Sequence, residues 1–460
     1  MDQEEEKEIG SQKGSGEDGD SSKREIPATQ SCDEEDSNTS DSDSDNRDDG
    51  DDSESESDAS SIESSSPYVS CIQETQLSPD GTCIFTTDYS RAFSTYVIDE
   101  DILEEPGTRQ LKPYSRFTSA DPIRAFAVNP YFSLSDMQSA TVLLSRRDQY
   151  ITLHNVLWDY SNNGESKHDA SSSKPIDAST KLANYKLIYH STEAVIAPLS
   201  LTFTRDATHF LAGHKNAISI FDVNYQDKPI SEIKTIPTRK LKAGGHGYKG
   251  EVTALSISSA TGMLAAGTRT RHVALYGAEG LGECITNFAL PRNLDTTAEP
   301  WKRMGTGVTE LKWSPCGKYL YIAERMSDSI FVYDVRNFAV GLRYCVGRGA
   351  MTNQKLGLDV WSSGDGSHEV WAGSMNGTVA VWKNPHLGHG ALQPDEVLSV
   401  GNAPVAGTLV HPTGSIAVSA MGCVKPGGDE EPVEGKARGG NGWLPKYNDW
   451  GRLDLLALCS

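Results

Sequence analysis

The sequence predicts an all-β protein, a seven-bladed β-propeller, because one strand-and-turn unit recurs along the chain at regular spacing. The clearest unit spans residues 356–383 and contains three short runs rich in Val and Trp. These runs are Leu356 to Trp361, Glu369 to Gly373 and Thr378 to Trp382. Asn376-Gly377 between the last two predicts a type I′ hairpin, in which both residues take a positive φ. A three-stranded sheet cannot bury both faces alone, so we expect neighbouring units to stack on it.

The same order of apolar runs and turns occurs at six other places. The clearer copies are 199–223, 252–278 and 308–335, and the degraded copies are 76–98, 123–156 and 405–422. From turn to turn, 56 residues separate Ser259 from Pro315 and 50 separate Pro315 from Asp365. This spacing is a little above the roughly 40–45 residues of a WD repeat. Seven WD-like units in a closed ring are favoured over two stacked sandwiches because the period is regular.

The 460-residue chain has a formal net charge of −22, and most of that charge belongs to residues 1–66. This segment has 24 Asp and Glu against 5 Lys and Arg, whereas residues 67–460 have 40 against 37. Low hydrophobicity with high charge cannot offset the entropy of ordering, so we predict a disordered acidic tail before the propeller. The acidic start disfavours a signal peptide, and no apolar run is long enough to span a membrane.

Serines embedded in the acidic tail suit acidophilic kinases, and each phosphate would add about −1.5 to −2 charge. The candidate serines are Ser40, Ser42, Ser44, Ser53, Ser55 and Ser57. A tail that only solubilises the protein is the simpler explanation. A tail that docks a basic partner, or that covers a basic face of the propeller, is the alternative.

Two polar insertions are expected within the propeller domain, residues 67–460. They lie at about 160–184, after the second unit, and at about 425–448, within the last unit. Leu453 to Leu458 is expected to be the third strand of the last unit. The outer strand of that unit is expected to come from the start of the domain, around Ser66 to Ser70, because the ring has to close.

Signals for catalysis and for metal binding are poor. No phosphate-binding loop, HExxH or GxSxG motif is present, so we predict a monomeric, non-enzymatic protein without cofactor or small-molecule substrate. The 8 cysteines form no CxxC pair and are predicted to be free thiols. His386 and His389 lie in a Gly-rich loop without a third ligand, so no metal site is expected. Gly245-His246 has the position of the structural Gly-His pair of WD repeats.

Basic residues concentrate in the segments that share one face of the predicted propeller. If the first strand of each unit is innermost, the turns between second and third strands share a face with the loops that lead into first strands. Arg and Lys are frequent there, whereas the opposite turns are close to balanced. A basic rim suits an anionic partner, because phosphate contacts release counterions. Tyr89, Tyr248 and Trp301 lie near this rim and would stack unpaired bases. The alternative is that these are ordinary solvated turn residues.

The run Gly347 to Lys355, which ends in Thr-Asn-Gln-Lys before the strand LGLDVW, resembles the telomerase Cajal body protein family of WD-repeat proteins. Supporting segments are 77–86, 128–136, 145–155 and 201–222. The resemblance covers about residues 70–422 and implies a nuclear scaffold that binds small Cajal-body RNAs and telomerase RNA. A fungal branch of this family is linked to spliceosomal small nuclear ribonucleoproteins. The fourth unit departs from the pattern, with Tyr276-Gly277 in place of Trp-Asp, and the tail is more acidic than the family requires.

We therefore predict a nuclear scaffold for small nuclear or Cajal-body RNA and its ribonucleoproteins, with RNA across the basic rim. The RNA phosphates are expected on Arg146, Arg147, Lys215, Arg269, Arg271 and Arg348. The loop Thr352, Asn353, Gln354 and Lys355 is expected to contact RNA, with Asn353 and Gln354 either reading base edges or capping the loop. Changing Arg269, Arg271 and Arg348 to Glu is expected to abolish RNA retention with little change in melting. The rival hypothesis is a protein-only scaffold in signalling that resembles a G-protein β subunit and depends less on salt.

Overall fold

The computed structural model of the chain describes residues 69–104, 111–158, 175–189, 191–236, 247–291, 305–426 and 447–458. Every described residue belongs to one compact unit, Ser65–Ser460. The acidic tail and its six candidate serines therefore lie outside the described residues. So do Gly245, His246 and Trp301, and so do residues 160–174 and 427–446 of the two predicted insertions.

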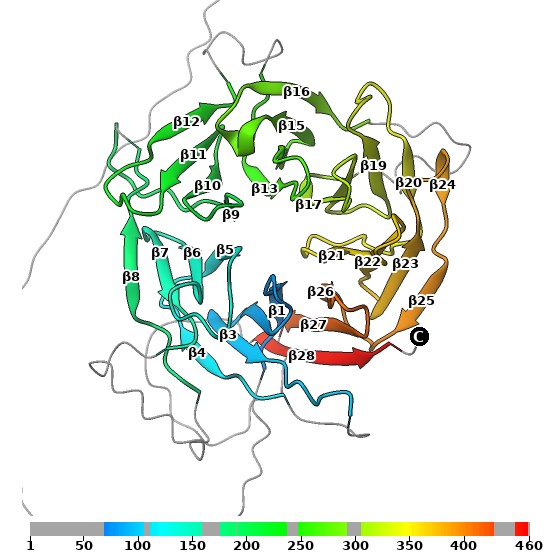
Figure 1. Ribbon diagram of the computed structural model, residues 1–460, viewed down its shortest axis with the longest axis horizontal. Helices are drawn as coiled ribbons and strands as arrows, with labels where there is room; N and C mark the ends of the chain where they lie inside the picture. The colour runs from blue at the N-terminus through cyan, green and yellow to red at the C-terminus, as the bar shows by residue number, and fades with distance from the viewer. Residues whose placement is uncertain are drawn as a thin grey trace, which may run out of the picture. The chain divides into compact units, whose positions relative to one another are not determined.

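Seven sheets follow one another around a ring and form the predicted seven-bladed propeller (Figure 1). The first strand of each blade is innermost, and the later strands follow outward. Blades 1 and 2 consist of β1 (Ile72–Leu77), β2 (Cys83–Asp88), β3 (Ala92–Val97) and β4 (Ser115–Thr118), then β5 (Ile123–Val128), β6 (Thr141–Arg146), β7 (Ile151–Asn155) and β8 (Lys181–Tyr185). Blades 3 and 4 consist of β9 (Ser200–Phe203), β10 (His209–His214), β11 (Ala217–Asp222) and β12 (Ser231–Lys234), then β13 (Val252–Ile257), β14 (Leu264–Thr268), β15 (His272–Tyr276) and β16 (Cys284–Ala289).

Blades 5 and 7 differ from the arrangement of four antiparallel strands, and blade 6 has an additional strand in one of its loops. Blades 5 to 7 consist of β17 (Val308–Trp313), β18 (Tyr319–Glu324), β19 (Ile330–Asp334) and β20 (Arg343–Cys345), then β21 (Leu358–Ser362), β22 (His368–Gly373), β23 (Thr378–Lys383) and β25 (Glu396–Ser399), then β26 (Val405–Val410), β27 (Ile416–Pro426) and β28 (Tyr447–Ala457). A short 3-10 turn, η2 (Ala278–Gly280), follows β15, and the loop after β23 contains β24 (Gly390–Leu392).

The strand β24 lies in the sheet of its neighbouring blade. Although it follows the third strand of blade 6, it pairs in parallel with β20, the outer strand of blade 5. Trp382 of blade 6 donates its indole N–H to the carbonyl of Leu392 in β24 over 3.2 Å. Val346, just after β20, donates its N–H to the same carbonyl over 2.9 Å. The loop therefore ties blades 5 and 6 together at their outer edge.

The last blade closes the ring in a different way from the one expected. Among the described residues its sheet has three strands, β26 to β28, without a fourth. Instead, Val69 accepts a hydrogen bond from the Gly451 N–H over 2.7 Å. A Cβ at Gly451 would lie 2.0 Å from the Ser70 carbonyl oxygen, and Gly422, its cross-strand partner, is almost as crowded by the same segment. The predicted outer strand at Ser66–Ser70 is thus wrong for its described part, which packs against a glycine pair.

Both predicted insertions are too long at their ends. Lys181 to Asn184, expected in the first insertion, belong to β8, the outer strand of blade 2. Lys425-Pro426 and Tyr447-Asn448, expected in the second, extend β27 and β28 as a paired ladder. In β8, Lys181, Leu182 and Asn184 are exposed, so this outer strand needs no apolar pattern on its solvent side.

The predicted hairpin at Asn376-Gly377 is present, but its turn is not type I′. Gly377 has φ of 78°, whereas Asn376 does not have a positive φ. The Ser374 hydroxyl accepts hydrogen bonds from the N–H groups of Asn376 and Thr378, each over 3.1 Å, and so fixes the turn. A Cβ at Gly377 would lie 2.3 Å from the Gly401 carbonyl oxygen, so both the backbone angle and the space require glycine there.

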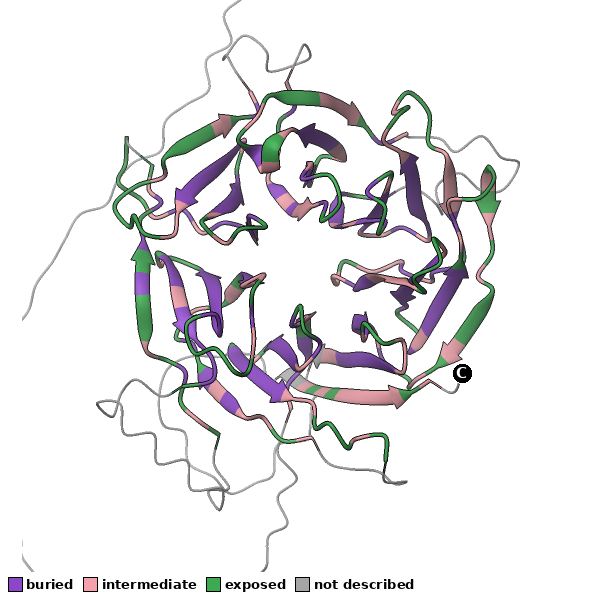
Figure 2. Ribbon diagram, in the orientation of Figure 1, coloured by how far each residue is buried: buried purple, intermediate pink, exposed green. Residues whose placement is uncertain are grey.

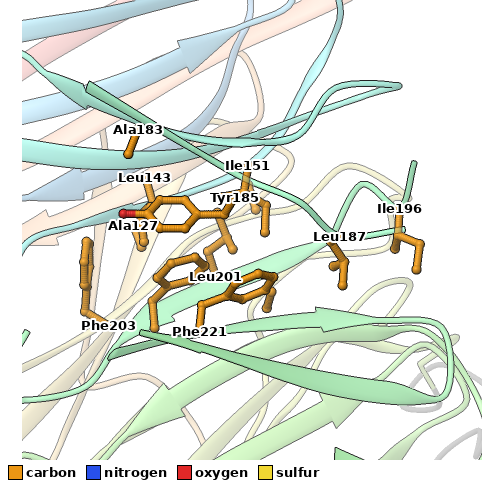
Figure 3. Close-up of a cluster of buried hydrophobic side chains, with 13 residues drawn as sticks. Ala127, Leu143, Ile151, Ala183, Tyr185, Leu187, Ile196, Leu201, Phe203 and Phe221 are labelled. Carbon is orange, nitrogen blue, oxygen red and sulfur yellow. The ribbon is translucent and has the colours of Figure 1, made fainter. Parts of the chain in front are cut away.

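The hydrophobic core is divided into seven clusters, one at each interface between neighbouring blades. The middle strands are largely buried, whereas the outer strands are mostly intermediate or exposed (Figure 2). The cluster between blades 2 and 3 stacks Phe210 on Phe221 with ring centroids 4.9 Å apart. Tyr185 packs edge-on against both rings, and Figure 3 shows Tyr185 beside Phe221. Among the described residues, the smallest cluster joins blade 7 to blade 1 and has four buried members, Ile84, Tyr96, Leu409 and Val418.

Removing the ring of Phe210 should destabilise the propeller strongly. The side chain is fully buried between two blades, so Phe210→Ala should lower the free energy of unfolding by about 3–5 kcal/mol in a denaturant titration. Tyr131→Ala is the matched control, because that aromatic ring is 61% exposed and its loss should cost under about 0.5 kcal/mol. Equal losses for the two variants would contradict the assignment of the core to the blade interfaces.

Candidate interaction surface

All ten predicted contact residues lie on one face of the propeller, which we call the loop face. It consists of the turns between second and third strands and the loops that lead into first strands. Hydrogen bonds join the two kinds of segment: Arg147 N–H to the Pro122 carbonyl, and Met326 N–H to the Thr352 carbonyl, each over 3.1 Å. The predicted grouping of these segments on one face is therefore observed, but the residues differ greatly in exposure.

Three of the predicted cations are exposed on the loop face. Arg147 and Lys215 lie in the turns of blades 2 and 3. The Arg269 side chain, in the turn of blade 4, is 58% exposed and forms an ion pair with Glu251 over 2.7 Å. An exposed ion pair of this kind contributes little to stability, so the Arg269 guanidinium remains available to a ligand.

Arg348 is not available to a ligand, because it is only 1% exposed. Its guanidinium donates hydrogen bonds to the carbonyl oxygens of Leu356 over 2.6 Å and of Gly373 over 3.3 Å. Burial lowers the pKa of Arg348 to about 10, although the carboxylates of Glu310 and Asp328 act against this shift. Arg348 therefore fastens the loop before β21 onto blade 6, and its assignment to RNA phosphate is wrong.

Arg146 is also buried, at 5% exposure, and belongs to a chain of hydrogen bonds inside blade 2. Its Nη2 donates to the Thr152 hydroxyl over 2.7 Å, and that hydroxyl donates to Nε2 of His154 over 2.9 Å. Nδ1 of His154 then donates to the Ala178 carbonyl over 3.1 Å. This sequence of donors requires a neutral His154. Burial and the charge of Arg146 lower the pKa of His154 to about 4.

Arg271 pairs with Glu324 of the next blade over 2.7 Å, and the Glu324 side chain is fully buried. Removal of the arginine would leave a buried carboxylate without its partner, which is strongly destabilising. The expectation that Glu at positions 269, 271 and 348 leaves melting nearly unchanged is therefore wrong, because two of the three arginines support the fold.

The remaining predicted contacts lie in the loop before β21 and near the rim. Asn353 is exposed, whereas Thr352 and Gln354 are half-buried, and the Thr352 hydroxyl accepts the Gln354 N–H over 3.1 Å. Lys355 forms an ion pair with Glu74 over 2.8 Å. Tyr248, proposed to stack bases, is only 4% exposed, and its hydroxyl is hydrogen-bonded to that of Tyr276. Tyr248 is thus a core residue.

The central channel has a volume of about 470 Å³ and opens on the loop face into a smaller charged pocket of about 180 Å³. We call this smaller pocket the mouth pocket. Its charged lining residues are Glu74, Arg124, Glu251, Arg269, Arg325 and Lys355. Arg269 and Lys355 were predicted as contacts, and the other four were not.

A β-bulge explains how Arg124 reaches the mouth pocket. The pairing of β5 with β6 shifts register between Ile123 and Ala125, so Arg124 is an extra residue in the innermost strand of blade 2. Thr253 and Thr309 occupy the same position in blades 4 and 5 and also line the pocket. Bulges re-aim side chains in this way. Simple alternation along the strand gives no signal for it.

Inside the channel, charged side chains connect the inner strands of neighbouring blades. Lys312 of blade 5 lies 3.3 Å from Asp359 of blade 6. The Glu310 carboxylate accepts the Leu358 N–H over 3.2 Å, and that of Asp359 accepts the Val410 N–H over 2.9 Å. Burial raises the pKa of Glu310, and the nearby cations Lys355 and Lys312 oppose this. These groups are engaged in holding blades 5, 6 and 7 together.

Among the described residues no three His, Cys, Asp or Glu side chains gather as metal ligands would. His386 instead stacks on His368, with ring centroids 4.4 Å apart. The six described cysteines are free. No helix in the described part of the chain is both long and apolar enough to cross a membrane.

The ring of seven repeated units, with third strands that end in motifs such as Ile220-Phe221-Asp222, defines a WD-repeat β-propeller with a basic loop face. The chain is similar to the guanine nucleotide-binding protein negative regulator 1 of Schizosaccharomyces pombe, with 25% identity over 315 residues, 67% of this chain and 70% of that protein. No model of a known protein family matches the chain. The similarity supports the WD-repeat propeller and gives no support to the telomerase Cajal body protein family.

The neutral His154 should make stability depend on pH. Because its folded pKa of about 4 lies below the unfolded value of about 6.5, the unfolded state binds more protons between these values. The stabilisation that the neutral His154 gives to the folded state is fully present above about pH 6.5 and is lost as the pH falls towards 4. In urea titrations between these pH values, the free energy of unfolding of His154→Gln should change less with pH than that of wild type. The difference in slope should be up to about 1.4 kcal/mol per pH unit. His389→Gln, at an exposed site, should keep the wild-type slope, and a wild-type slope for His154→Gln would contradict the buried relay.

Replacing Arg348 should damage the fold rather than a ligand contact alone. Arg348→Ala leaves several buried carbonyl groups without donors, so the free energy of unfolding should fall by about 2–4 kcal/mol. Arg147→Ala, on the same face but exposed, should change it by under about 0.5 kcal/mol. Calorimetric melting of both variants distinguishes a role of Arg348 in the fold from a role in ligand contact. An unchanged melting temperature for Arg348→Ala would contradict the role in the fold.

Proposed function

We propose that the protein is a non-enzymatic scaffold in signalling that binds a partner protein across its loop face. The observation that carries this proposal is the spread of exposed cations, Arg147, Lys215 and Arg269, over three consecutive blades of that face. Their long side chains lie on turns held by a rigid ring, so a partner would meet a pre-organised surface.

The similarity to a regulator of guanine nucleotide-binding proteins supports one class of partner. That relative matches this chain over 70% of its own length. We therefore infer that this chain binds a guanine nucleotide-binding protein, or a protein that acts with one, and restrains its signalling. A basic propeller face suits an acidic surface on that partner, since complementary charge speeds association and selects the partner.

The RNA hypothesis stays a prediction with weaker support. Burial of Arg146 and Arg348 removes two of its six expected phosphate contacts, and Arg271 is already paired. Arg147, Lys215 and Arg269 remain for either kind of partner. The nuclear location expected from the family resemblance also stays a prediction.

Reversing the three exposed charges should abolish partner binding without unfolding the ring. The variant Arg147→Glu/Lys215→Glu/Arg269→Glu should bind a purified guanine nucleotide-binding protein at least about tenfold more weakly than wild type in biolayer interferometry. Both the GDP-bound partner and the partner with a non-hydrolysable GTP analogue are tested. Lys228→Glu/Lys318→Glu/Arg336→Glu, with three exposed charges reversed in turns of the opposite face, is the matched control.

Two results would overturn this proposal. One is equal partner binding by both triple variants. The other is retention of small nuclear RNA by purified wild-type protein, with a steep fall between low and moderate salt and no binding to the guanine nucleotide-binding protein.

A further inference from the structure

We propose that the mouth pocket receives one phosphorylated serine or threonine side chain from the partner protein. This inference rests on the proposed function, because it names the chemistry by which the loop face would recognise that partner. It assigns a role to Arg124 and Arg325, which neither the sequence pattern nor the similarity to the relative singles out.

The mouth pocket has unused cationic capacity. Two of its cations are paired, Arg269 with Glu251 and Lys355 with Glu74, at 2.7 and 2.8 Å. Within the described residues, neither Arg124 nor Arg325 has a carboxylate partner. Arg124 is exposed at its bulge, and the Arg325 guanidinium donates one hydrogen bond to another described residue, from Nη1 to the Asn353 carbonyl over 3.1 Å.

Arg325 is held near the positive charge of Arg269, and an anion in the mouth pocket would relieve this repulsion. Burial lowers the pKa of Arg325, and the charge of Arg269 lowers it further. Arginine remains charged under these conditions, so the like-charge repulsion persists in the free protein. An anion placed between these side chains would gain charge-assisted hydrogen bonds from planar guanidinium groups, a geometry well suited to phosphate.

The charge balance favours a phosphoryl group over a carboxylate. The pocket has four cationic and two anionic side chains, an excess of two positive charges. A phosphoserine carries about −1.5 to −2 charge at neutral pH and matches this excess, whereas a glutamate neutralises only half of it.

The same geometry argues against a nucleic-acid strand as the occupant. A volume of about 180 Å³ accommodates one side chain at the end of the channel rather than a length of backbone. Glu74 and Glu251 stand in the lining and would repel the neighbouring phosphates of a continuous strand. A single phosphorylated side chain, projecting from an extended segment laid across the loop face, avoids this repulsion.

The test uses the full chain and immobilised degenerate nonapeptide libraries with a central phosphoserine, glutamate or serine. Wild-type protein should bind the phosphoserine library most strongly, the glutamate library weakly and the serine library least. Arg124→Ala/Arg325→Ala should lose about tenfold in affinity for the phosphoserine library. Arg124→Lys/Arg325→Lys should retain part of the binding, and inorganic phosphate at constant ionic strength should compete.

The matched control is Lys318→Ala/Arg336→Ala, which removes two exposed positive charges from turns of the opposite face and should bind as wild type does. Thermal melting verifies that each variant is folded. Equal binding of the phosphoserine and serine libraries, or equal loss in the pocket and control variants, would overturn the proposal. So would mixed-sequence single-stranded RNA that binds in an Arg124- and Arg325-dependent way while phosphopeptides do not.

Failure of the pocket is distinguishable from failure of the proposed function. The guanine nucleotide-binding protein could bind wild type and Arg124→Ala/Arg325→Ala equally but fail to bind Arg147→Glu/Lys215→Glu/Arg269→Glu. This result would support the scaffold function and contradict the pocket proposal. If that protein binds no form of the chain while the phosphoserine library still requires Arg124 and Arg325, the pocket stands and the proposed partner class falls.

Discussion

Closure of the ring is the constraint on which the rest of the structure depends. Every blade buries its two faces against its neighbours, so no blade has a complete core until the last one meets the first. The interface between blades 7 and 1 achieves this with the smallest cluster of the seven. Its shortage of apolar contact is offset by polar contacts, the Val69–Gly451 hydrogen bond and the hydrogen bond from the Ser70 hydroxyl to the Asp449 carboxylate.

The same constraint explains why several basic residues of the loop face are not free. Neighbouring blades are joined by charged side chains of the inner strands, such as Lys312 and Asp359, and by side chains of the loop face. Arg271 and Arg348 act there as fasteners between or within blades, and each satisfies groups that would otherwise be buried without partners. The cations left over, on turns and at the channel mouth, are the ones available for recognition. Structural and binding roles are thus divided among residues of one chemical type.

Periodicity was sufficient to predict the seven blades and the order of their strands, because alternation and turn residues recur in every unit. It also grouped the loop-face residues correctly. It could not separate the buried Arg146 and Arg348 from the exposed Arg147, because burial of an arginine depends on carbonyl groups that only the tertiary fold assembles. Arg124 was missed for a related reason: a bulge changes the direction of one side chain without changing the composition of the strand. Closure by a glycine pair likewise has no local signal.

The strand β24 has a consequence for the dynamics of the ring. Because it belongs by sequence to blade 6 and by hydrogen bonding to blade 5, neither blade can detach from the ring by itself. Amide hydrogens in the two blades should therefore exchange with solvent in one cooperative opening event, as expected of a single folding subunit. Transient opening of the circle would then begin outside this pair, at the thinly packed seam between blades 7 and 1.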